Sequence, residues 1–509
     1  MSLKKNSIIK FASIFLVFLT IFIALQAVLL LKNPPIWPDE VMLTDIANNW
    51  LNQHKLGTDL FLNTYTQANN RVYTYPPLYF YTQAIWLKLF GLSIASVRLF
   101  SLTFTFLFSI TFFFLIKLFL KEKYPVKSKI NPNLLALITL TALLIDPLFF
   151  QATHFARAEI VVLFWGTLGF YVFTRSKQGK NFSKVSRVLT LTTGILFSLA
   201  FLTHYIGAFF AFSAFVSLLL KEKLSIFKSE SFYLLLISFL TIPIIWLATL
   251  LNNLEVVYSQ TSLLVGTFAG FAPYITRLIL GEPAIQLLLI IYILITTIFI
   301  VYVIRAKIQA YLPLCSLLTI TWLTVIFAKE MWYFVYVIPW IYLSASILIY
   351  NLFTKPQKPS LKYTLIQTVG ILFVINIALN IVLILNLVRN FSGDKYSYHD
   401  FTENIIKVIP KEKSIFLSTI PDPYFGLKTS PNKYTIYEFP IVKTPKENYL
   451  ELLNKSDYIV YNGIYSVMTT DLLSEYINLN TQEIYNIEGK NQYQAQVIKL
   501  KPRNQRRSP

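Results

Sequence analysis

The chain has 509 residues, of which 55% are hydrophobic and 16% aromatic, and its mean hydropathy is +0.56. These values exclude an ordinary soluble protein, because several apolar stretches reach the ~20 residues that a helix needs to cross a bilayer. The net charge is +20, but most of the excess lies in short loops between apolar stretches with few aromatic residues among them. This pattern sets membrane orientation and argues against nucleic acid as a partner. The single cysteine, Cys315, excludes an intramolecular disulfide.

The first apolar stretch, residues 11–31, is too long for a cleaved signal peptide and lacks a small-residue cleavage site. We therefore predict a retained anchor, with its N-terminus in the cytoplasm because Lys4, Lys5 and Lys10 precede it. Prolines at positions 34, 35 and 38 then stop the helix and stiffen the exit. Two adjacent carboxylates, Asp39 and Glu40, follow at the outer membrane face, although acids there are also common as plain polar caps.

The next segment decides the topology of the whole chain. Residues 41–75 predict an amphipathic helix along the membrane surface, with apolar side chains around Ile46, Trp50 and Leu51. The apolar stretch that follows, up to Gly91, has only about 15 residues, which is short for a span. If it lies in the interface, every strongly basic loop falls on the cytoplasmic side, whereas if it crosses, those loops move outside. The charge pattern therefore selects the interfacial interpretation.

That choice predicts about eleven spans, with the N-terminus inside and the C-terminus outside. After the anchor, the predicted spans cover residues 98–120, 134–150, 160–174, 189–202, 206–220, 231–250, 284–304, 311–327, 336–350 and 364–387. We predict a multi-pass protein of the cell membrane.

The composition changes after Arg389, which divides the chain into a membrane domain, 1–390, and a polar domain, 391–509. The sequence pattern of the second domain predicts strands at 414–417, 458–461 and 495–500 that alternate with helices such as 401–409 and 447–453. We therefore predict a small α/β domain outside the membrane. Residues 503–509 are predicted to be a disordered basic tail.

The same topology gathers four groups of polar residues on the outer face. They are Asp39 with Glu40; His154, Arg157 and Glu159; His204 with Thr203 and Tyr205; and Lys329 with Tyr333 and Tyr336. Arg157 and Glu159 are two residues apart and cannot share a helix face, which predicts an irregular turn or a helix start. Each group also has a plainer interpretation: an ion pair capping two helices, a hydrogen-bonded turn at His204, or a snorkelling lysine at Lys329.

Carboxylates and cations around one extracytoplasmic cavity suit group transfer from a phosphate. A carboxylate that deprotonates an acceptor hydroxyl contributes roughly 10²–10⁴ in rate. Lys and Arg side chains neutralise the departing phosphate. Nucleotide sugars are absent outside the cytoplasm, so a lipid-linked phosphate is the expected donor. Two acids alone are a weak signal for a divalent ion, so the need for a metal stays open.

Several motifs in chain order resemble those of the GT-C glycosyltransferases. They are Trp37-Pro38-Asp39-Glu40, Tyr75-Pro76-Pro77-Leu78-Tyr79, Phe90-Gly91, Val97-Arg98-Leu99-Phe100-Ser101 and His154-Phe155-Ala156-Arg157-Ala158-Glu159. The most similar branch is the protein O-mannosyltransferase and lipid A aminoarabinose-transferase-like group, with its bacterial members. The resemblance implies a polyprenyl-phosphate-sugar donor and an inverting transfer to an extracytoplasmic lipid, glycan or protein acceptor.

The resemblance also implies roles for individual residues. Asp39 matches the catalytic acidic position, Glu40 its neighbour, and Glu159 with Arg157 the second acidic motif, while Lys329 matches a phosphate-contacting position. Some relatives carry a lysine just before the Pro-Pro-Leu sequence, where this chain has Thr74-Tyr75, and Arg71 is the candidate substitute. The C-terminal domain does not match the β-trefoil of eukaryotic mannosyltransferases, which puts a protein acceptor in question.

We therefore predict an integral membrane glycosyltransferase, either a hexosyl- or a pentosyltransferase. The predicted catalytic residues are Asp39, Glu40 and Glu159; the predicted donor-phosphate ligands are Arg157, Lys329 and Arg71; and the predicted pocket-lining residues are His154, His204, Tyr75 and Tyr333. One alternative is a transporter or lipid flippase, although the sequence shows no paired broken helices and places its ionisable residues at span ends. Another is a non-catalytic sensor that binds ligand through the outer domain.

Overall fold

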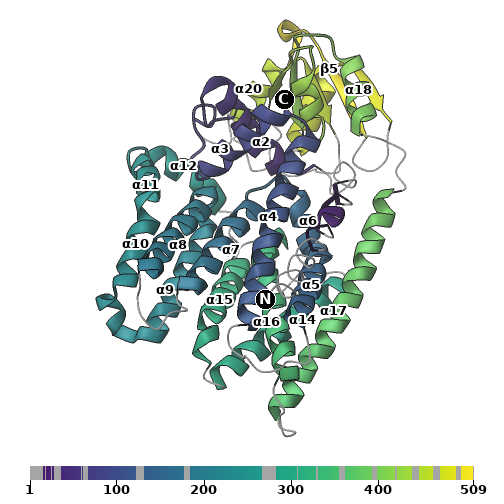
Figure 1. Cartoon of the computed structure of the whole chain (residues 1–509). Helices are drawn as coiled ribbons and strands as arrows, with labels where there is room; N and C mark the ends of the chain where they lie inside the picture. The colour runs from purple at the N-terminus through teal and green to yellow at the C-terminus, as the bar shows by residue number, and fades with distance from the viewer. Residues whose placement is uncertain are drawn as a thin grey trace.

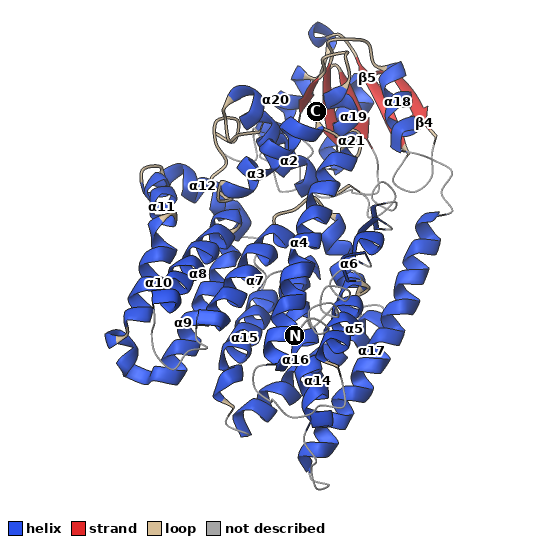
Figure 2. Ribbon diagram, in the orientation of Figure 1, coloured by secondary structure: helices blue, strands red, loops and turns tan. Residues whose placement is uncertain are grey.

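The computed structural model describes residues 15–17, 19–24, 26–27, 36–58, 60, 67–121, 131–176, 184–265, 283–305, 308–327, 331–354, 361–392, 398–418, 421–437, 446–461, 470–488 and 494–507. Lys329 lies outside these residues, as do residues 11–14, 18, 25 and 28–31 of the predicted N-terminal anchor. A bundle of helices forms the larger part of the molecule, and a small sheet with its own helices covers one end (Figures 1 and 2). The short helices α2 and α3 lie between these two parts (Figure 1).

The helical part follows the apolar stretches of the sequence. Its helices are α2 (Pro38–Gln53), α3 (Leu78–Phe90), α4 (Ile94–Lys121), α5 (Pro132–Leu144), α6 (Pro147–His154), α7 (Glu159–Ser176), α8 (Lys184–Thr203), α9 (Ala208–Glu222), α10 (Glu230–Thr241), α11 (Pro243–Leu251), α12 (Leu254–Val265), α14 (Pro283–Arg305), α15 (Leu312–Phe327), α16 (Ile338–Thr354) and α17 (Leu361–Ser392). Short 3₁₀ helices join several of them, including η2 (Tyr205–Gly207), η3 (Lys223–Lys228), η4 (Gln309–Tyr311) and η5 (Met331–Tyr336).

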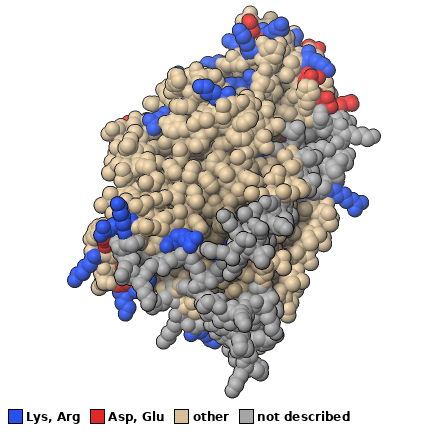
Figure 3. Space-filling model, viewed as in Figure 1, with Lys and Arg blue, Asp and Glu red and all other residues tan. Residues whose placement is uncertain are grey.

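Among the described residues, five helices are long and apolar enough to cross a membrane, and two bent pairs bring the number to seven. The pairs are α5 with α6, bent by 67°, and α10 with α11, bent by 53°. The predicted spans 134–150 and 231–250 coincide with these two bent pairs, and the other predicted spans from residue 98 onward each coincide with a helix, although α15 and α16 are shorter than a full span. In the view of Figure 3, Lys and Arg gather toward the two ends of the molecule and leave a wide uncharged belt between them.

The two bent pairs correct one expectation from the sequence. Broken helices were expected to be missing, and their absence was used against a transporter, yet the structure contains two of them. At the break between α5 and α6, Asp146 caps α6 by accepting bonds from the backbone N–H groups of Leu148 and Phe149, both at 3.1 Å. The hydroxyls of Tyr292 and Tyr342 also donate to this carboxylate. The break is therefore fixed by a buried polar cluster that joins α14 and α16.

The C-terminal part is the predicted α/β domain. A mixed five-stranded sheet has the order β2-β1-β3-β5-β4, with β1 parallel to β2 and β3, and β5 antiparallel to β3 and β4. The strands are β1 (Ser414–Ser418), β2 (Thr435–Tyr437), β3 (Tyr458–Tyr461), β4 (Thr481–Ile487) and β5 (Ala495–Leu500), and the helices are α18 (Tyr398–Val408), α19 (Tyr424–Thr429), α20 (Lys446–Lys455) and α21 (Thr470–Asn480). The three strands predicted from sequence are confirmed, while β2 and β4 were missed.

The sheet has two buried faces because side chains alternate along each strand. On β1, Phe416 packs with Tyr449 and Tyr476 under α20 and α21. Its neighbours Ile415 and Leu417 face the other way and belong to the same continuous hydrophobic core as the helical bundle. The C-terminal domain is thus attached to the membrane part by packing as well as by the chain. The division near residue 390 stays a prediction.

Two further expectations were wrong. The helix after the acidic turn, α2, does not lie on a surface with one buried face, because consecutive residues from Val41 to Ala47 are all buried. It is covered by α3 on one side and by the C-terminal domain on another. The basic tail is also ordered as far as Arg507: the Arg506 guanidinium donates to the carbonyl oxygen of Lys501 at 2.7 Å, and Asn480 donates to that of Arg507 at 2.8 Å.

Candidate active site

The acidic turn, residues 37–40, opens α2. Pro38 occupies the first helical position, where its missing N–H costs nothing and its fixed φ suits the helix. Asp39 and Glu40 follow in the first turn, where the helix dipole favours negative charge. The Glu40 carboxylate reaches back to accept a hydrogen bond from the backbone N–H of Trp37 at 3.0 Å. The sequence therefore fixes both carboxylates at one helix end.

Glu40 is fully buried and its carboxylate is fully engaged. Arg98 on α4 donates to both of its oxygens, from Nε at 3.0 Å and from Nη2 at 2.8 Å. The backbone N–H of Ala156 donates to Oε1 at 2.8 Å, in addition to the bond from Trp37 to Oε2. One side chain thus ties together α2, α4 and the loop that carries Arg157.

That loop, residues 155–158, is the irregular turn that the sequence predicted between α6 and α7. Its carbonyl oxygens are held from two other helices: Ser101 on α4 donates to Phe155, and Tyr79 on α3 donates to Ala156, both at 2.8 Å. Because the loop is fixed at its backbone, the Arg157 side chain leaves it in a defined direction.

Arg157 bridges the two acidic motifs. Its Nη1 donates to Asp39 Oδ2 at 2.6 Å, while Nε and Nη2 donate to Glu159 Oε1 at 3.0 and 2.7 Å. The side chain of Asp39 retains 21% exposure, compared with 7% for Arg157 and 5% for Glu159. Asp39 is therefore the acid of this group that a substrate can reach most readily.

Aromatic residues and a histidine surround this ion-pair cluster. Tyr75 lies edge-on to His204, with ring centroids 5.6 Å apart, and its phenol interacts electrostatically with Asp39. Tyr333 stacks on Tyr336 with centroids 6.1 Å apart, and both interact electrostatically with Arg157 and Glu159. Tyr75, His204 and Tyr333 thus come together around Asp39, Arg157 and Glu159.

His204 is held in one tautomer. Its Nδ1 accepts a hydrogen bond from the backbone N–H of Ile206 at 3.2 Å, so the proton of the neutral ring is on Nε2. Burial lowers the pKa of His204 to about 4, although the negative charge of Glu159 opposes this shift. The residue is therefore a neutral hydrogen-bond donor at neutral pH.

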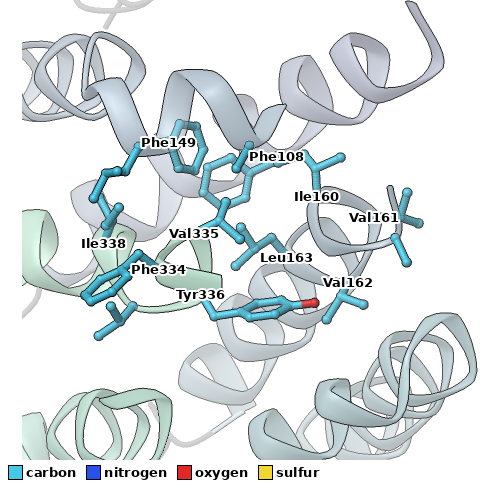
Figure 4. Packing of buried hydrophobic residues seen from close by; sticks show 14 of the residues in the cluster. Phe108, Phe149, Ile160, Val161, Val162, Leu163, Phe334, Val335, Tyr336 and Ile338 are labelled. Atoms are coloured by element: carbon cyan, nitrogen blue, oxygen red, sulfur yellow. The ribbon is translucent and has the colours of Figure 1, made fainter. Parts of the chain in front are cut away.

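Two buried oxygens beside the cluster have no hydrogen-bond partner among the described residues: Glu159 Oε2 and the Tyr336 hydroxyl. Figure 4 shows this hydroxyl pointing toward Val162 on α7, one helical turn after Glu159. Apolar side chains near this tyrosine include Leu163 and Val335 (Figure 4). Buried polar atoms are nearly always paired in folded proteins.

Three residues predicted from sequence do not join this cluster in the described contacts. Both ring nitrogens of His154 face backbone carbonyl oxygens, of Phe150 at 2.7 Å and of Gln26 at 3.4 Å. Arg71 lies over the ring of Tyr73, with Cζ 5.0 Å from its centroid, and makes no ion pair with a described residue. Lys329 lies outside the described residues.

The sequence places Arg98 in one of the motifs, but no role for this residue was predicted from it. A signal was present, since a charged residue inside a long apolar helix is costly and usually has a specific partner. Tyr79 and Ser101 were missed because backbone carbonyls, not side chains, are their partners.

Burial raises the pKa of Asp39 above its ordinary value, and the nearby negative charges of Glu159 and Glu40 act in the same direction, while Arg157 opposes them.

Among the described residues, no three metal-ligating side chains converge. The position between Asp39 and Glu159 is taken by the Arg157 guanidinium instead of an ion. These residues as arranged do not fit a divalent metal, and we derive no step through one.

Comparison with protein-family models gives no match, and comparison with the sequences of curated proteins gives none either. Among solved structures, the chain is similar to ArnT from Cupriavidus metallidurans, both in the apo state (TM-score 0.60) and bound to undecaprenyl phosphate (TM-score 0.58). Each match has 14% identity and covers 97% of this chain and 98% of ArnT. A third match is the oligosaccharyltransferase AglB from Archaeoglobus fulgidus, in complex with an inhibitory peptide and a dolichol-phosphate. It has a TM-score of 0.52 and 12% identity, and covers 94% of this chain and 74% of AglB.

Both proteins are GT-C glycosyltransferases, and the likeness extends over nearly the whole chain, including the C-terminal domain. The chain therefore has the GT-C fold, which confirms the fold that the sequence resemblance implied.

Proposed function

We propose that this chain is an integral membrane glycosyltransferase that moves a sugar from a polyprenyl-phosphate donor to an extracytoplasmic lipid, glycan or protein acceptor. The observation that carries the proposal is the Asp39–Arg157–Glu159 cluster, in which the start of α2 meets the loop and helix start at residues 155–159 within a GT-C fold. The solved structure of ArnT with undecaprenyl phosphate supports a lipid-phosphate donor for a chain of this fold.

In the proposed reaction, Asp39 is the general base. It takes the proton of an acceptor hydroxyl while that oxygen attacks the anomeric carbon of the donor. The bond between this carbon and the phosphate oxygen breaks, so the configuration inverts and the polyprenyl phosphate leaves with the bonding electron pair. A positioned base of this kind contributes roughly 10²–10⁴ in rate.

Arg157 is suited to stabilise the departing phosphate. In the resting state its charge is shared between Asp39 and Glu159. When Asp39 becomes protonated, the attraction at Nη1 weakens, and this N–H is released as the negative charge grows on the phosphate. A fixed cation in a site shielded from water is worth more than one in solvent. Arg71 and Lys329 stay proposals for further phosphate contacts.

The two acids next to Asp39 are assigned different tasks. Glu40 has no free acceptor position, so we assign it a positioning role in place of the catalytic role expected from sequence. Glu159 uses one oxygen to hold Arg157 and leaves Oε2 free. We assign this oxygen, together with the Tyr336 hydroxyl and His204 Nε2–H, to hydroxyl groups of the donor sugar.

Transfer can be tested with the full-length protein in lipid nanodiscs. Polyprenyl-phosphate sugars are supplied one at a time, and release of free polyprenyl phosphate is followed by mass spectrometry. We expect turnover with at least one donor and a rate about 10²- to 10⁴-fold lower with Asp39→Asn, while the variant remains folded and inserted. Transbilayer movement of the donor without any bond cleavage would instead support the flippase alternative. Sugar identity, hexose or pentose, is read from the same assay.

The proposed topology has the N-terminus in the cytoplasm and the C-terminal domain outside the cell membrane. Single cysteines placed in the domain, for example at exposed Glu475, test this assignment after Cys315 is replaced by alanine. Labelling of intact cells by a membrane-impermeant maleimide supports it, and labelling only after lysis contradicts it.

A further inference from the structure

Residues 421–428, a turn that continues into helix α19, connect the C-terminal sheet to the acidic helix α2. This turn lies at the carboxyl end of a parallel strand, the edge at which open α/β sheets usually present functional residues. In this chain that edge faces the membrane part, where α2 lies below the sheet (Figure 1).

The first contact is at Asp45, in the second turn of α2. The Tyr424 hydroxyl donates to its Oδ1, and the Lys428 ammonium lies 3.1 Å from the same oxygen. Its Oδ2 accepts bonds from Thr58 at 2.7 Å and from Asn49 at 3.1 Å. Asp45 and Tyr424 are both essentially inaccessible to solvent. Breaking up such a buried charge cluster is costly, because the remaining partners cannot be solvated.

The second contact is at Asp422, on the same turn. This side chain is fully buried, and the backbone of Ile36, immediately before the acidic turn, is one of the groups that act on its carboxyl. The charged groups that act on it are Arg98 and Glu40, the pair that fixes the acidic turn. The same stretch of the C-terminal domain therefore faces α2 at its first turn and at its second.

The turn itself is held rigidly on the domain. The Tyr398 hydroxyl donates to the carbonyl oxygen of Asp422 at 2.6 Å and accepts a bond from the backbone N–H of Gly426 at 3.3 Å. A side chain at Gly426 would have its Cβ 2.6 Å from that of Thr402, so the turn packs on α18 without space between them. A movement of the domain is thus transmitted to α2.

We propose that Tyr424, Lys428 and Asp422 are positioning residues through which the C-terminal domain holds Asp39 in its reactive geometry. This inference rests on the proposed function for its catalytic consequence, though not for its structural part. Asp39 lies on the same short helix as Asp45, so a tilt of α2 moves the base relative to Arg157. A misplacement of about 1 Å can cost ~100-fold in rate.

The experiment compares the full-length wild type with the double variant Tyr424→Phe/Lys428→Met. The first control is Lys428→Arg, which keeps a positive charge next to the Asp45 carboxylate. The second control is Lys499→Met, which removes a partly exposed ion pair with Glu483 on the far side of the domain. Hydrogen–deuterium exchange is measured for peptides that cover residues 36–53, and kcat and KM are measured for the polyprenyl-phosphate donor that the wild type uses.

We expect faster exchange of residues 36–53 in the double variant, with kcat about 10- to 100-fold lower and KM for the donor within about twofold. Lys428→Arg and Lys499→Met should match the wild type in both measurements. Unchanged exchange in the double variant would overturn the proposal, as would a raised KM with normal kcat, which would make the turn part of a binding surface. If the double variant does not fold, Lys428→Met alone is measured, since this lysine is 31% exposed.

The two proposals fail in different ways. If the wild type transfers no sugar from any donor, the proposed function is wrong, while the exchange of residues 36–53 still tests the mechanical coupling. If the wild type transfers sugar and the double variant is unaffected, only the positioning role is wrong.

Discussion

Asp39 and Arg157 form an ion pair of 2.6 Å although 118 residues separate them in the sequence. Their meeting depends on Glu40, which accepts hydrogen bonds from the backbone N–H of Trp37, the first residue of the acidic turn, and from that of Ala156, just before the arginine. Arg98 neutralises this connecting carboxylate from α4. The ion pair of Asp39 with Arg157 is thus supported by a second, fully buried pair of Glu40 with Arg98 behind it.

The first prediction concerns the proposed base. Asp39→Asn keeps the size of the side chain but cannot take a proton, so we expect kcat to fall by about 10²- to 10⁴-fold. The thermal midpoint should change little, because the side chain is partly exposed. The control is Asp471→Asn on α21, an exposed acid far along the chain. Turnover of Asp39→Asn close to that of the wild type would exclude the base role.

The second prediction concerns the pH profile. A base must be ionised, so kcat/KM is lost as the pH falls through the pKa of Asp39, which burial raises above its ordinary value. Arg157 lowers that pKa, so Arg157→Gln should move the acid limb to higher pH as well as reduce the rate. The position of the limb is read from a full pH–rate curve for each protein. A limb that stays in place in Arg157→Gln would mean that another group titrates.

The third prediction concerns the buried pair behind the site. Arg98→Met leaves the carboxylate of Glu40 buried without its counter-charge, which should cost about 3–5 kcal/mol in stability. The double variant Glu40→Gln/Arg98→Met removes both charges and should be more stable than Arg98→Met alone.

The matched control for this pair is Arg187→Met, which breaks a solvent-exposed pair with Glu230. Exposed pairs contribute about 0–1 kcal/mol, so its thermal midpoint should be nearly that of the wild type. Equal effects of Arg98→Met and Arg187→Met would contradict the assignment of Glu40 as the connecting residue.

Much of this arrangement could be predicted from the sequence. Apolar stretches located the helices, and the basic loops and acidic turns located Asp39, Arg157, Glu159 and His204, because charges at span ends are few and stand out. The role of Glu40 could not be predicted, since the sequence does not distinguish an acid that reacts from a neighbouring acid that only positions other groups. Its partners are two backbone N–H groups and Arg98, contacts that only the folded chain defines.

In the C-terminal domain, too, some features could be predicted from the sequence and others could not. The strands β1, β3 and β5 carry runs of buried apolar residues and were predicted, whereas β2 has three residues and β4 is largely exposed. The docking of Tyr424 on Asp45 joins residues 379 positions apart, and no local pattern marks either of them. The tail was misjudged because composition suggested disorder, while Arg506 and Arg507 are held by backbone carbonyls and Asn480.

The fourth prediction tests the orphaned oxygens. Tyr336→Phe removes a hydroxyl that has no hydrogen-bond partner among the described residues, so stability should be unchanged or slightly higher. If the hydroxyl binds the donor sugar, kcat/KM should fall about 10-fold, consistent with a lost hydrogen bond of 1–1.5 kcal/mol. Tyr292→Phe is the control, because its hydroxyl donates to Asp146 and its removal should lower the thermal midpoint. Full activity of Tyr336→Phe across donor sugars would exclude the hydroxyl contact.

The fifth prediction concerns the charge state of Asp422. Burial raises the pKa of Asp422 from 3.8 to about 7, with Arg98 opposing and Glu40 adding to the shift. Between these values the unfolded chain releases a proton that the folded chain keeps, so the free energy of unfolding decreases as the pH rises. The decrease attributable to this residue is roughly 4 kcal/mol between pH 4 and 7. In Asp422→Asn that part of the slope is removed, so the variant should gain stability relative to wild type as the pH increases. Parallel stability curves for the two proteins, measured by chemical denaturation in the same detergent, would show that Asp422 is ionised throughout and that its carboxylate is compensated by Arg98.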